Sequence, residues 1–358
     1  MKVALVTFHN DIGQLKVGGV ATGPIYFKGV LSRYTGYDPD ILVVGPQHKN
    51  SGFLDQVEFV TENVPDRLNQ YEFIIFNTPG FTYEDFDESK VGHAYDYVLN
   101  GLNTPFAFIV NEERDRHLYP YYMEFVEHPM LKFVLFNSIG MHEDFPEMYE
   151  KCGKWIEYNY MIPLDDIDTI LERFDQKDYG KIISTARWTD RKRVAELAQM
   201  TPRLKELGFN VTIAGAAQNY FASRKVLVNT ECWTNRGYYT PDQLPEMLSD
   251  KALHYNFVCT KRPRKNQIMR PRLELATYEA FNQGCLPIVC TQTSPDWVKN
   301  YCCVALDKDQ LSDLPEILSK LTVGDMRVMM MNFMREVELN VVPMWEAIGQ
   351  AIYEEGKY

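Results

Sequence analysis

The sequence predicts an α/β protein made of two Rossmann-like domains, each with its own parallel sheet. Short apolar runs of buried-strand type alternate with helical stretches, which is the pattern of a parallel sheet covered on both faces. The alternation breaks near residue 160 and begins again near residue 181. The length of 358 residues also exceeds what a single compact core usually holds. Two domains are therefore expected, over residues 1–160 and 165–340.

The first domain is predicted from five short apolar runs whose length and content favour buried strands. They lie at residues 3–8, 41–44, 73–76, 106–110 and 133–136. A glycine-rich loop is expected at residues 17–23, followed by a helix that runs to residue 32. At residues 158–163 the rhythm breaks, and Pro163 with the acidic residues behind it favours a hinge between domains.

The second domain repeats the pattern, beginning with a βαβ unit. The expected elements are a strand at 181–185, a helix at 191–207, a strand at 210–215, a helix at 240–248, an apolar run at 255–259 and closing helices at 325–338 and 342–355. Tails of such two-domain proteins commonly return to the first domain, and we expect this of residues from about 342 to 358.

Composition narrows the function. The net charge of −12 excludes a general nucleic-acid coat protein, which would be basic, but not an enzyme that meets DNA through one local patch. No apolar run reaches 18 residues, so we expect no membrane partner. The first residues lack a cleavage site and are too short for a signal peptide. Seven cysteines without metal-ligand spacing favour reduced thiols in a cytoplasm. We also expect the protein to be a monomer.

The segment at residues 270–289 is the most informative part of the sequence. It predicts a helix that bears Glu274 and Glu279, stops at Gly284 and leads into a buried strand. A helix N-terminus behind a basic loop suits an anion, and carboxylates accept hydrogen bonds from hydroxyl groups. Together these features suit a sugar nucleotide. The alternative is an ordinary helix–turn–strand unit with two solvated glutamates.

A run of cations surrounds the start of that helix. It comprises Lys261, Arg262, Arg264, Lys265, Arg270 and Arg272. Three interpretations stay open: a solvated loop, a site for donor phosphates, and contact with a polynucleotide acceptor.

Several landmarks occur in the order found in a known family. They are Gly18-Gly19-Val20 after the first strand, Tyr158-Asn159-Tyr160 before Pro163, Arg187 and Lys192 after a strand of the second domain, and Glu274, Glu279, Gly284 and Pro287 at the family's spacing. In these landmarks the chain resembles the bacteriophage enzymes that glucosylate hydroxymethylcytosine in DNA, in particular the α-glucosyltransferase type of the GT-B superfamily.

The resemblance implies a GT-B architecture, in which two parallel sheets face each other across a cleft. The first domain would bind the acceptor and the second the nucleotide sugar. It further implies transfer of glucose, or of a pentose such as arabinose, from a UDP-sugar to 5-hydroxymethylcytosine in double-stranded phage DNA, with retention of configuration. Such a modification would serve restriction evasion in the cytoplasm of the bacterial host.

The resemblance also implies roles for individual residues. Arg187 and Lys192 would bind the diphosphate, and Gly18 and Gly19 would let the backbone approach it. Glu279 would accept hydrogen bonds from the ribose, while Glu274 would face the sugar or the diphosphate. The other expected donor contacts are Val20, Arg270 and Arg272, and the expected DNA or phosphate patch is Lys261, Arg262, Arg264 and Lys265.

The segment after residue 110 departs from the family, whose corresponding run is rich in His and Asp. Here Glu112, Glu113 and Asp115 are the candidates for accepting the acceptor's proton or stabilising developing positive charge. His117 is a weaker candidate, since a lone histidine is more often a packing or surface residue.

No cofactor beyond the donor substrate is expected. A metal-binding Asp-x-Asp would directly follow a strand, which none of the acidic pairs does; these are Asp38/Asp40, Asp85/Asp87 and Asp166/Asp168. One alternative is a GT-B enzyme with a polysaccharide, lipid or small-molecule acceptor. Another is a catalytically silent nucleotide- or DNA-binding module, against which the two glutamates and the Arg187/Lys192 pair argue.

Overall fold

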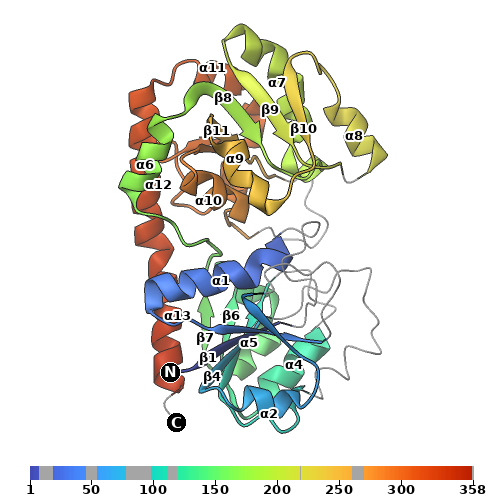
Figure 1. Cartoon of the computed structure of the whole chain (residues 1–358), viewed down its shortest axis with the longest axis vertical. Helices are drawn as coiled ribbons and strands as arrows, with labels where there is room; N and C mark the ends of the chain where they lie inside the picture. The colour runs from blue at the N-terminus through green and yellow to red at the C-terminus, as the bar shows by residue number, and fades with distance from the viewer. Residues whose placement is uncertain are drawn as a thin grey trace. The chain divides into compact units, whose positions relative to one another are not determined.

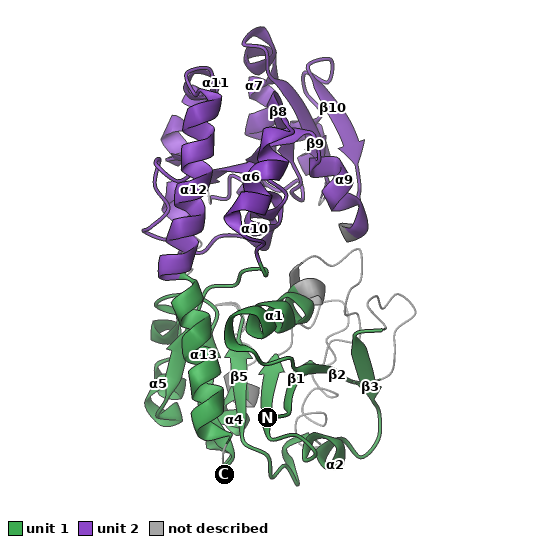
Figure 2. Cartoon of the chain, turned by 60° about the vertical axis from the view of Figure 1, so that its left-hand side comes forward, with its two compact units in different colours: residues 1–163, 341–358 green, residues 164–340 purple. Residues whose placement is uncertain are grey.

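The structure is a computed structural model, and it describes residues 1–7, 19–45, 55–77, 98–111, 119–217, 219–259 and 270–356. The chain divides into two compact units (Figure 2). Unit 1 comprises Met1–Pro163 and Val341–Tyr358, and unit 2 comprises Leu164–Asn340. Among the described residues, no helix is both long and apolar enough to cross a membrane.

Unit 1 is built on a sheet of seven strands in the order β3-β2-β1-β4-β5-β6-β7, and every pair is parallel (Figure 1). The strands are β1 Val3–Thr7, β2 Asp40–Val44, β3 Val57–Val60, β4 Phe73–Asn77, β5 Phe106–Val110, β6 Leu131–Phe136 and β7 Trp155–Glu157. The five predicted strands are confirmed to within two residues. Strands β3 and β7 were not predicted, because both are short and neither is a fully buried apolar run.

Helices cover both faces of this sheet. They are α1 Gly19–Thr35, α2 Val64–Leu68, α4 Tyr119–Glu127, α5 Pro146–Cys152 and α13 Val342–Glu355, with the 3-10 turn η2 Met141–Asp144. Phe125 of α4 and Met148 of α5 belong to the hydrophobic core on one face of the sheet. On the other face α1 packs on α13, where the rings of Phe27 and Trp345 lie 4.8 Å apart. The indole nitrogen of Trp345 donates to the carbonyl of Asn159 at 3.1 Å.

The expectation of a glycine-rich loop over residues 17–23 is wrong for its second half, since α1 begins at Gly19. Gly23 and Pro24 lie inside the helix. Both residue types usually mark breaks, but here the packing of the apolar side of α1 on β1, β2 and α13 outweighs the local preference.

Unit 2 repeats the arrangement with six parallel strands in the order β10-β9-β8-β11-β12-β13. These are β8 Asp178–Ser184, β9 Asn210–Ala214, β10 Trp233–Gly237, β11 Lys251–Tyr255, β12 Leu286–Cys290 and β13 Val304–Leu306. The helices are α6 Ile167–Asp175, α7 Val194–Glu206, α8 Tyr220–Val226, α9 Leu244–Leu248, α10 Leu275–Asn282, α11 Leu314–Leu318 and α12 Val323–Asn340. The 3-10 turns are η3 Asp190–Lys192, η4 Pro241–Gln243, η5 Thr291–Thr293 and η6 Lys308–Asp313.

Gly284 ends α10 as predicted. Its φ of +76° lies in the left-handed region, where a side chain is strained. An added Cβ would also come within 2.7 Å of the backbone nitrogen of Phe174. The stop therefore needs glycine, and it turns the chain directly into β12, one of the buried strands of the sheet.

Candidate functional site

The carboxyl ends of the parallel strands in unit 2 meet at one edge of the sheet, which is where open α/β sheets bind ligands. Three segments converge there: the turn η3 after β8, the residues that follow β11, and the entry to α10. Backbone hydrogen bonds join the first two of these segments and tie the third to the turn η5 after β12. The amide of Cys259 donates to the carbonyl of Arg191 at 2.9 Å, and the amide of Arg272 donates to the carbonyl of Thr293 at 3.0 Å.

Glu274 is the centre of a charged cluster at this edge. Its Oε1 accepts a hydrogen bond from Nη2 of Arg191 at 2.8 Å, and its Oε2 lies 3.3 Å from Nζ of Lys192. Arg272 adds a third positive charge that acts on both Glu274 and Lys192. We call Arg191, Lys192, Arg272 and Glu274 the carboxyl-end cluster. Three positive charges thus surround a single carboxylate.

Burial and charge set the protonation of this cluster. Burial alone would raise the pKa of Glu274, but the charges of Lys192, Arg191 and Arg272 outweigh it and lower the pKa to about 2. Burial lowers the pKa of Lys192, while the charge of Glu274 opposes that shift. The cluster borders a pocket with a cavity volume of about 10 Å³, room for one water molecule, lined by Arg272, Glu274 and Cys290 among others. The excess positive charge of the carboxyl-end cluster can attract an anionic group.

The prediction of one helix that carries both carboxylates is wrong. Helix α10 begins at Leu275, and Glu274 is its N-cap residue with an extended backbone (φ −72°, ψ 146°). Its side chain does not cap the helix. The reason is tertiary, because both carboxylate oxygens are engaged by Arg191 and Lys192. Neither glutamate is the solvated residue of the alternative interpretation, since Glu279 is half-buried as well.

The other predicted donor residues of unit 2 lie around the cluster. Arg187 follows β8, is exposed, and forms no ion pair with a described residue. Arg270 and Arg272 precede α10 and are half-buried. Glu279 lies in α10, and its negative charge acts on Tyr239, whose pKa burial raises to about 12. Thus Lys192, Arg272 and Glu274 are brought together, whereas no contact in the described part of the chain joins Arg187 to Lys192.

Sequence reasoning missed three polar residues behind the cluster. His254 on β11 is 1% exposed, and its Nε2 lies 2.8 Å from Oγ1 of Thr185, which follows β8. The hydroxyl of Tyr239 donates to the carbonyl of Thr185 at 2.6 Å. A histidine in the otherwise apolar run 252–255 was the available signal. Arg191 was also missed, because it was interpreted as ordinary surface charge beside Lys192.

Several predicted residues lie outside the described part of the chain. They are Gly18, Glu112, Glu113, Asp115, His117, Lys261, Arg262, Arg264 and Lys265. Gly19 and Val20 begin α1. The carboxyl end of β5 is described up to Asn111, whose Nδ2 donates to Oδ1 of Asn77 at 3.0 Å and whose Oδ1 accepts from the hydroxyl of Tyr160 at 3.0 Å. Polar groups therefore gather at the carboxyl ends of β4 and β5 in unit 1.

Acidic pairs considered for metal binding have other partners where they are described. Asp166 caps α6 by accepting from the amide of Thr169 at 2.9 Å. Asp38 lies 2.9 Å from Nζ of Lys28, and Asp40 accepts from Tyr71 at 2.8 Å. Asp85 and Asp87 lie outside the described residues. Within the described ranges no three His, Cys, Asp or Glu side chains form a metal-binding group, and all seven cysteines are free.

Two parallel α/β units, each of Rossmann type, define the class of this protein as the GT-B fold, which confirms the predicted fold class. Solved structures with this fold match nearly the whole chain. At their level of sequence identity the likeness shows the fold.

The particular proteins that it resembles include a phage enzyme and two other proteins. The T4 phage β-glucosyltransferase, solved in complex with UDP-glucose, has a TM-score of 0.57 and 13% identity, covering 98% of this chain and 99% of its own. An α-glucosyltransferase in complex with UDP and a 13-mer DNA has a TM-score of 0.61 and 13% identity, covering 99% and 94%. HepE from Anabaena, in complex with UDP-glucose, has a TM-score of 0.61 and 13% identity, covering 99% and 100%. No family model matches the sequence, and no curated protein matches it.

Proposed function

We propose that this chain is a glycosyltransferase that takes its sugar from a UDP-sugar, with unit 2 as the donor-binding unit. The observation that carries the proposal is the carboxyl-end cluster, in which Arg191, Lys192 and Arg272 surround Glu274. A diphosphate is an anion of matching charge, and the edge on which the cluster lies is where this fold class binds ligands. The structures of similar fold that contain UDP or UDP-glucose support the same ligand.

In this reaction the protein must stabilise the departing diphosphate and orient the sugar. Arg187, Lys192, Arg270 and Arg272 are the proposed diphosphate contacts, Arg by a bidentate fork and Lys as a point charge. Glu279 is the proposed ribose contact. The ion pairs of Glu274 assign it a further task, which is to hold Arg191 and Lys192 in place. Because these four cations would neutralise the charge of the leaving diphosphate, we propose that no metal is required, and unchanged turnover in EDTA is the expected result.

We propose 5-hydroxymethylcytosine in double-stranded DNA as the acceptor, bound by unit 1, with retention of configuration. Two enzymes of similar fold support this acceptor: one is described as DNA-modifying, and another was solved with DNA. Gly18, Gly19 and Val20 are further proposed donor contacts, and Glu112, Glu113 and Asp115 are the proposed proton acceptors. The cations Lys261, Arg262, Arg264 and Lys265 would contact DNA or donor phosphates. We further propose that the protein is a monomer and that it acts in the cytoplasm of the bacterial host.

One assay tests the whole proposal. The protein is incubated with hydroxymethylcytosine-containing DNA and a panel of UDP-sugars, and the nucleosides are analysed by mass spectrometry. The expected result is a mass gain of one hexose or pentose. Release of UDP without a nucleoside gain would move the acceptor to a polysaccharide, a lipid or a small molecule. No turnover of any donor would refute the transferase proposal and favour a binding module.

The donor site is tested separately with Glu279→Ala. This substitution should weaken UDP-sugar binding at least about tenfold, because a carboxylate that accepts from both ribose hydroxyls is lost. Isothermal titration calorimetry measures the change, and circular dichroism checks that the fold is intact. Unchanged affinity would remove Glu279 from the donor site.

A further inference from the structure

His254 lies behind the carboxyl-end cluster, where the proposed chemistry assigns it no task. It is the fourth residue of β11 and pairs in register with Ile183 on β8. Its Nε2 lies 2.8 Å from Oγ1 of Thr185, the first residue after β8. Its Nδ1 is buried and has no hydrogen-bond partner among the described residues. The contact therefore joins two neighbouring strands at the edge where a ligand would bind.

The imidazole of His254 is neutral at physiological pH. Burial, together with the positive charge of Lys192, lowers its pKa to about 3. A neutral imidazole carries one proton, on either Nδ1 or Nε2. A proton on Nδ1 would leave a buried donor unpaired, whereas a bare Nδ1 is only an unused acceptor, which folded proteins tolerate more readily. The proton is therefore assigned to Nε2, which donates to Thr185.

This assignment determines what the hydroxyl of Thr185 does. Since its oxygen accepts from His254, its own hydrogen must be donated elsewhere. No acceptor for that hydrogen occurs within the ranges that the structure describes. The backbone carbonyl of Thr185 is held as well, by the hydroxyl of Tyr239 at 2.6 Å. Thr185 is thus fixed at two points, with one donor hydrogen left at the carboxyl end of β8.

We propose that His254 is a positioning residue that orients the hydroxyl of Thr185 as a hydrogen-bond donor to an oxygen of the nucleotide-sugar diphosphate. The inference rests on the proposed function, which supplies the diphosphate as ligand. Thr185 lies two residues before Arg187 in the sequence. Its partner His254 feels the positive charge of Lys192. A fixed donor costs no reorganisation when the leaving group gains charge, so it favours the transition state.

Four variants test the proposal, with UDP affinity measured by calorimetry and donor turnover by UDP release. Thr185→Val keeps the shape and removes the hydroxyl, and it should weaken UDP binding about tenfold. His254→Phe cannot donate and should cause a similar loss, while His254→Gln, which can donate an amide hydrogen, should retain most of the affinity. Combining Thr185→Val with His254→Phe should add little further loss, because both remove one interaction. Thr201→Val is the matched control: this threonine of α7 is also buried, and its hydroxyl donates to the carbonyl of Ala198.

A spectroscopic measurement tests the assignment without any ligand. Nitrogen-15 NMR of the imidazole should show a protonated Nε2 and a bare Nδ1 for His254, with no titration between pH 5 and 8. His254→Gln identifies the signal by removing it. A protonated Nδ1 would overturn the inference.

The two proposals fail in different ways. If the parent binds UDP and Thr185→Val binds it equally well, the inference is wrong and the proposed function stands. If the parent binds neither UDP nor any UDP-sugar, the proposed function is wrong and the inference falls with it. Circular dichroism of each variant separates lost binding from lost folding, and Thr185→Val decides the question even if His254→Phe does not fold.

Discussion

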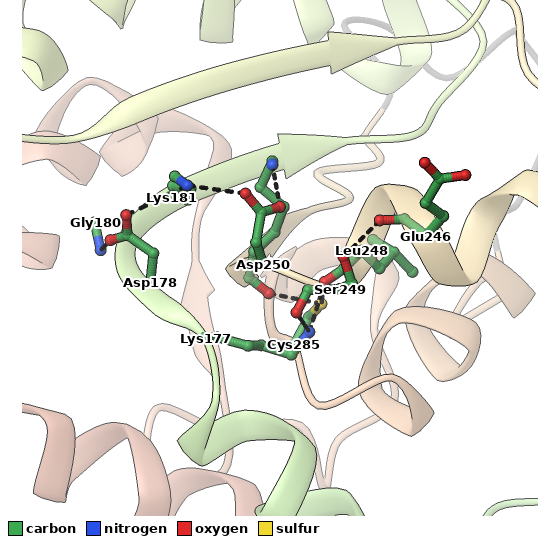
Figure 3. Close-up of polar contacts among 10 residues, drawn as sticks. Lys177, Asp178, Gly180, Lys181, Glu246, Leu248, Ser249, Asp250 and Cys285 are labelled. Atoms are coloured by element: carbon green, nitrogen blue, oxygen red, sulfur yellow. Dashed lines mark hydrogen bonds and ion pairs between the residues drawn. The ribbon is translucent and has the colours of Figure 1, made fainter.

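Lysine side chains lie at both ends of the sheet in unit 2, with Lys177 buried at one end and Lys192 half-buried at the other, and their partners differ. At the amino ends of β8 and β11, Nζ of Lys177 donates to the carbonyl of Leu248 at 2.5 Å, and Nζ of Lys181 lies 2.8 Å from Asp250 and 3.5 Å from Asp178 (Figure 3). Asp250 also forms an ion pair with Lys251. We call Lys177, Asp178, Lys181, Asp250 and Lys251 the amino-end cluster. At the carboxyl end, three cations surround Glu274.

The two clusters differ in how many carboxylates their cations share. In the amino-end cluster each lysine meets a carboxylate or a backbone carbonyl of the same chain, so the cluster ties β8 to β11 and the end of α9. The three cations of the carboxyl-end cluster have one carboxylate between them, whereas the three lysines of the amino-end cluster have two, so attraction for an external anion is stronger at the carboxyl end. The same residue type thus serves the fold at one edge and, under the proposed function, a ligand at the other.

The largest expected effect comes from Glu274→Gln. Removing this carboxylate leaves Arg191, Lys192 and Arg272 without their shared partner, and we expect a loss of about 3 kcal/mol in the free energy of unfolding, near the low end for such pairs because the site is partly exposed. Urea denaturation measures it. A loss no greater than that of Asp250→Asn would break the comparison.

Acid should destabilise the carboxyl end before the amino end. The pKa of His254 is about 3 in the folded chain and near 6.5 when unfolded, so the unfolded state binds more protons below pH 6.5 and stability falls as pH falls. Between pH 7 and pH 5 this residue should remove about 2 kcal/mol of stability. Glu274, with its pKa lowered to about 2, adds to the loss only below about pH 4.5. Denaturation of the parent and of His254→Gln at both pH values measures the contribution of His254 to the free energy of unfolding. The same change in stability with pH in both proteins would contradict the prediction.

Lysine substitutions at the two ends should separate binding from folding. Lys192→Met should weaken UDP binding about tenfold, since a charged contact to phosphate is lost. Lys177→Met, at the opposite end of the same sheet, should leave UDP affinity unchanged. Calorimetry on both folded variants gives the answer. Equal affinities in the two variants would show that the carboxyl-end cluster is not the donor site.

The smallest effect is expected from Asp250→Asn in the amino-end cluster. The carboxylate is 47% exposed, so water screens its ion pairs with Lys181 and Lys251, and the loss in unfolding free energy should be below about 1 kcal/mol. Urea denaturation beside Glu274→Gln sharpens the comparison. A loss above about 2 kcal/mol would mean that the amino-end cluster contributes as much as the carboxyl-end cluster.

Much of the fold could be predicted, and the misses have physical causes. Strands such as β5 and β12 are continuous apolar runs because a parallel sheet buries both of their faces, so their pattern is visible locally. Strand β3 has a mixed pattern, and α1 starts among glycines and a proline, so neither has a clear local signal. The candidate site was harder to predict than the fold. Glu274 was found from its spacing, but its partners lie more than 80 residues away.

Local pattern was enough to predict two parallel sheets, the five apolar strands of unit 1 and the stop at Gly284, because each depends on local periodicity or on one backbone angle. Only the tertiary structure decided that Glu274 leaves the helix to pair with Arg191 and Lys192, and that His254 meets Thr185. Those contacts join segments distant in the chain, and their strength comes from burial and from neighbouring charge, which no local pattern records.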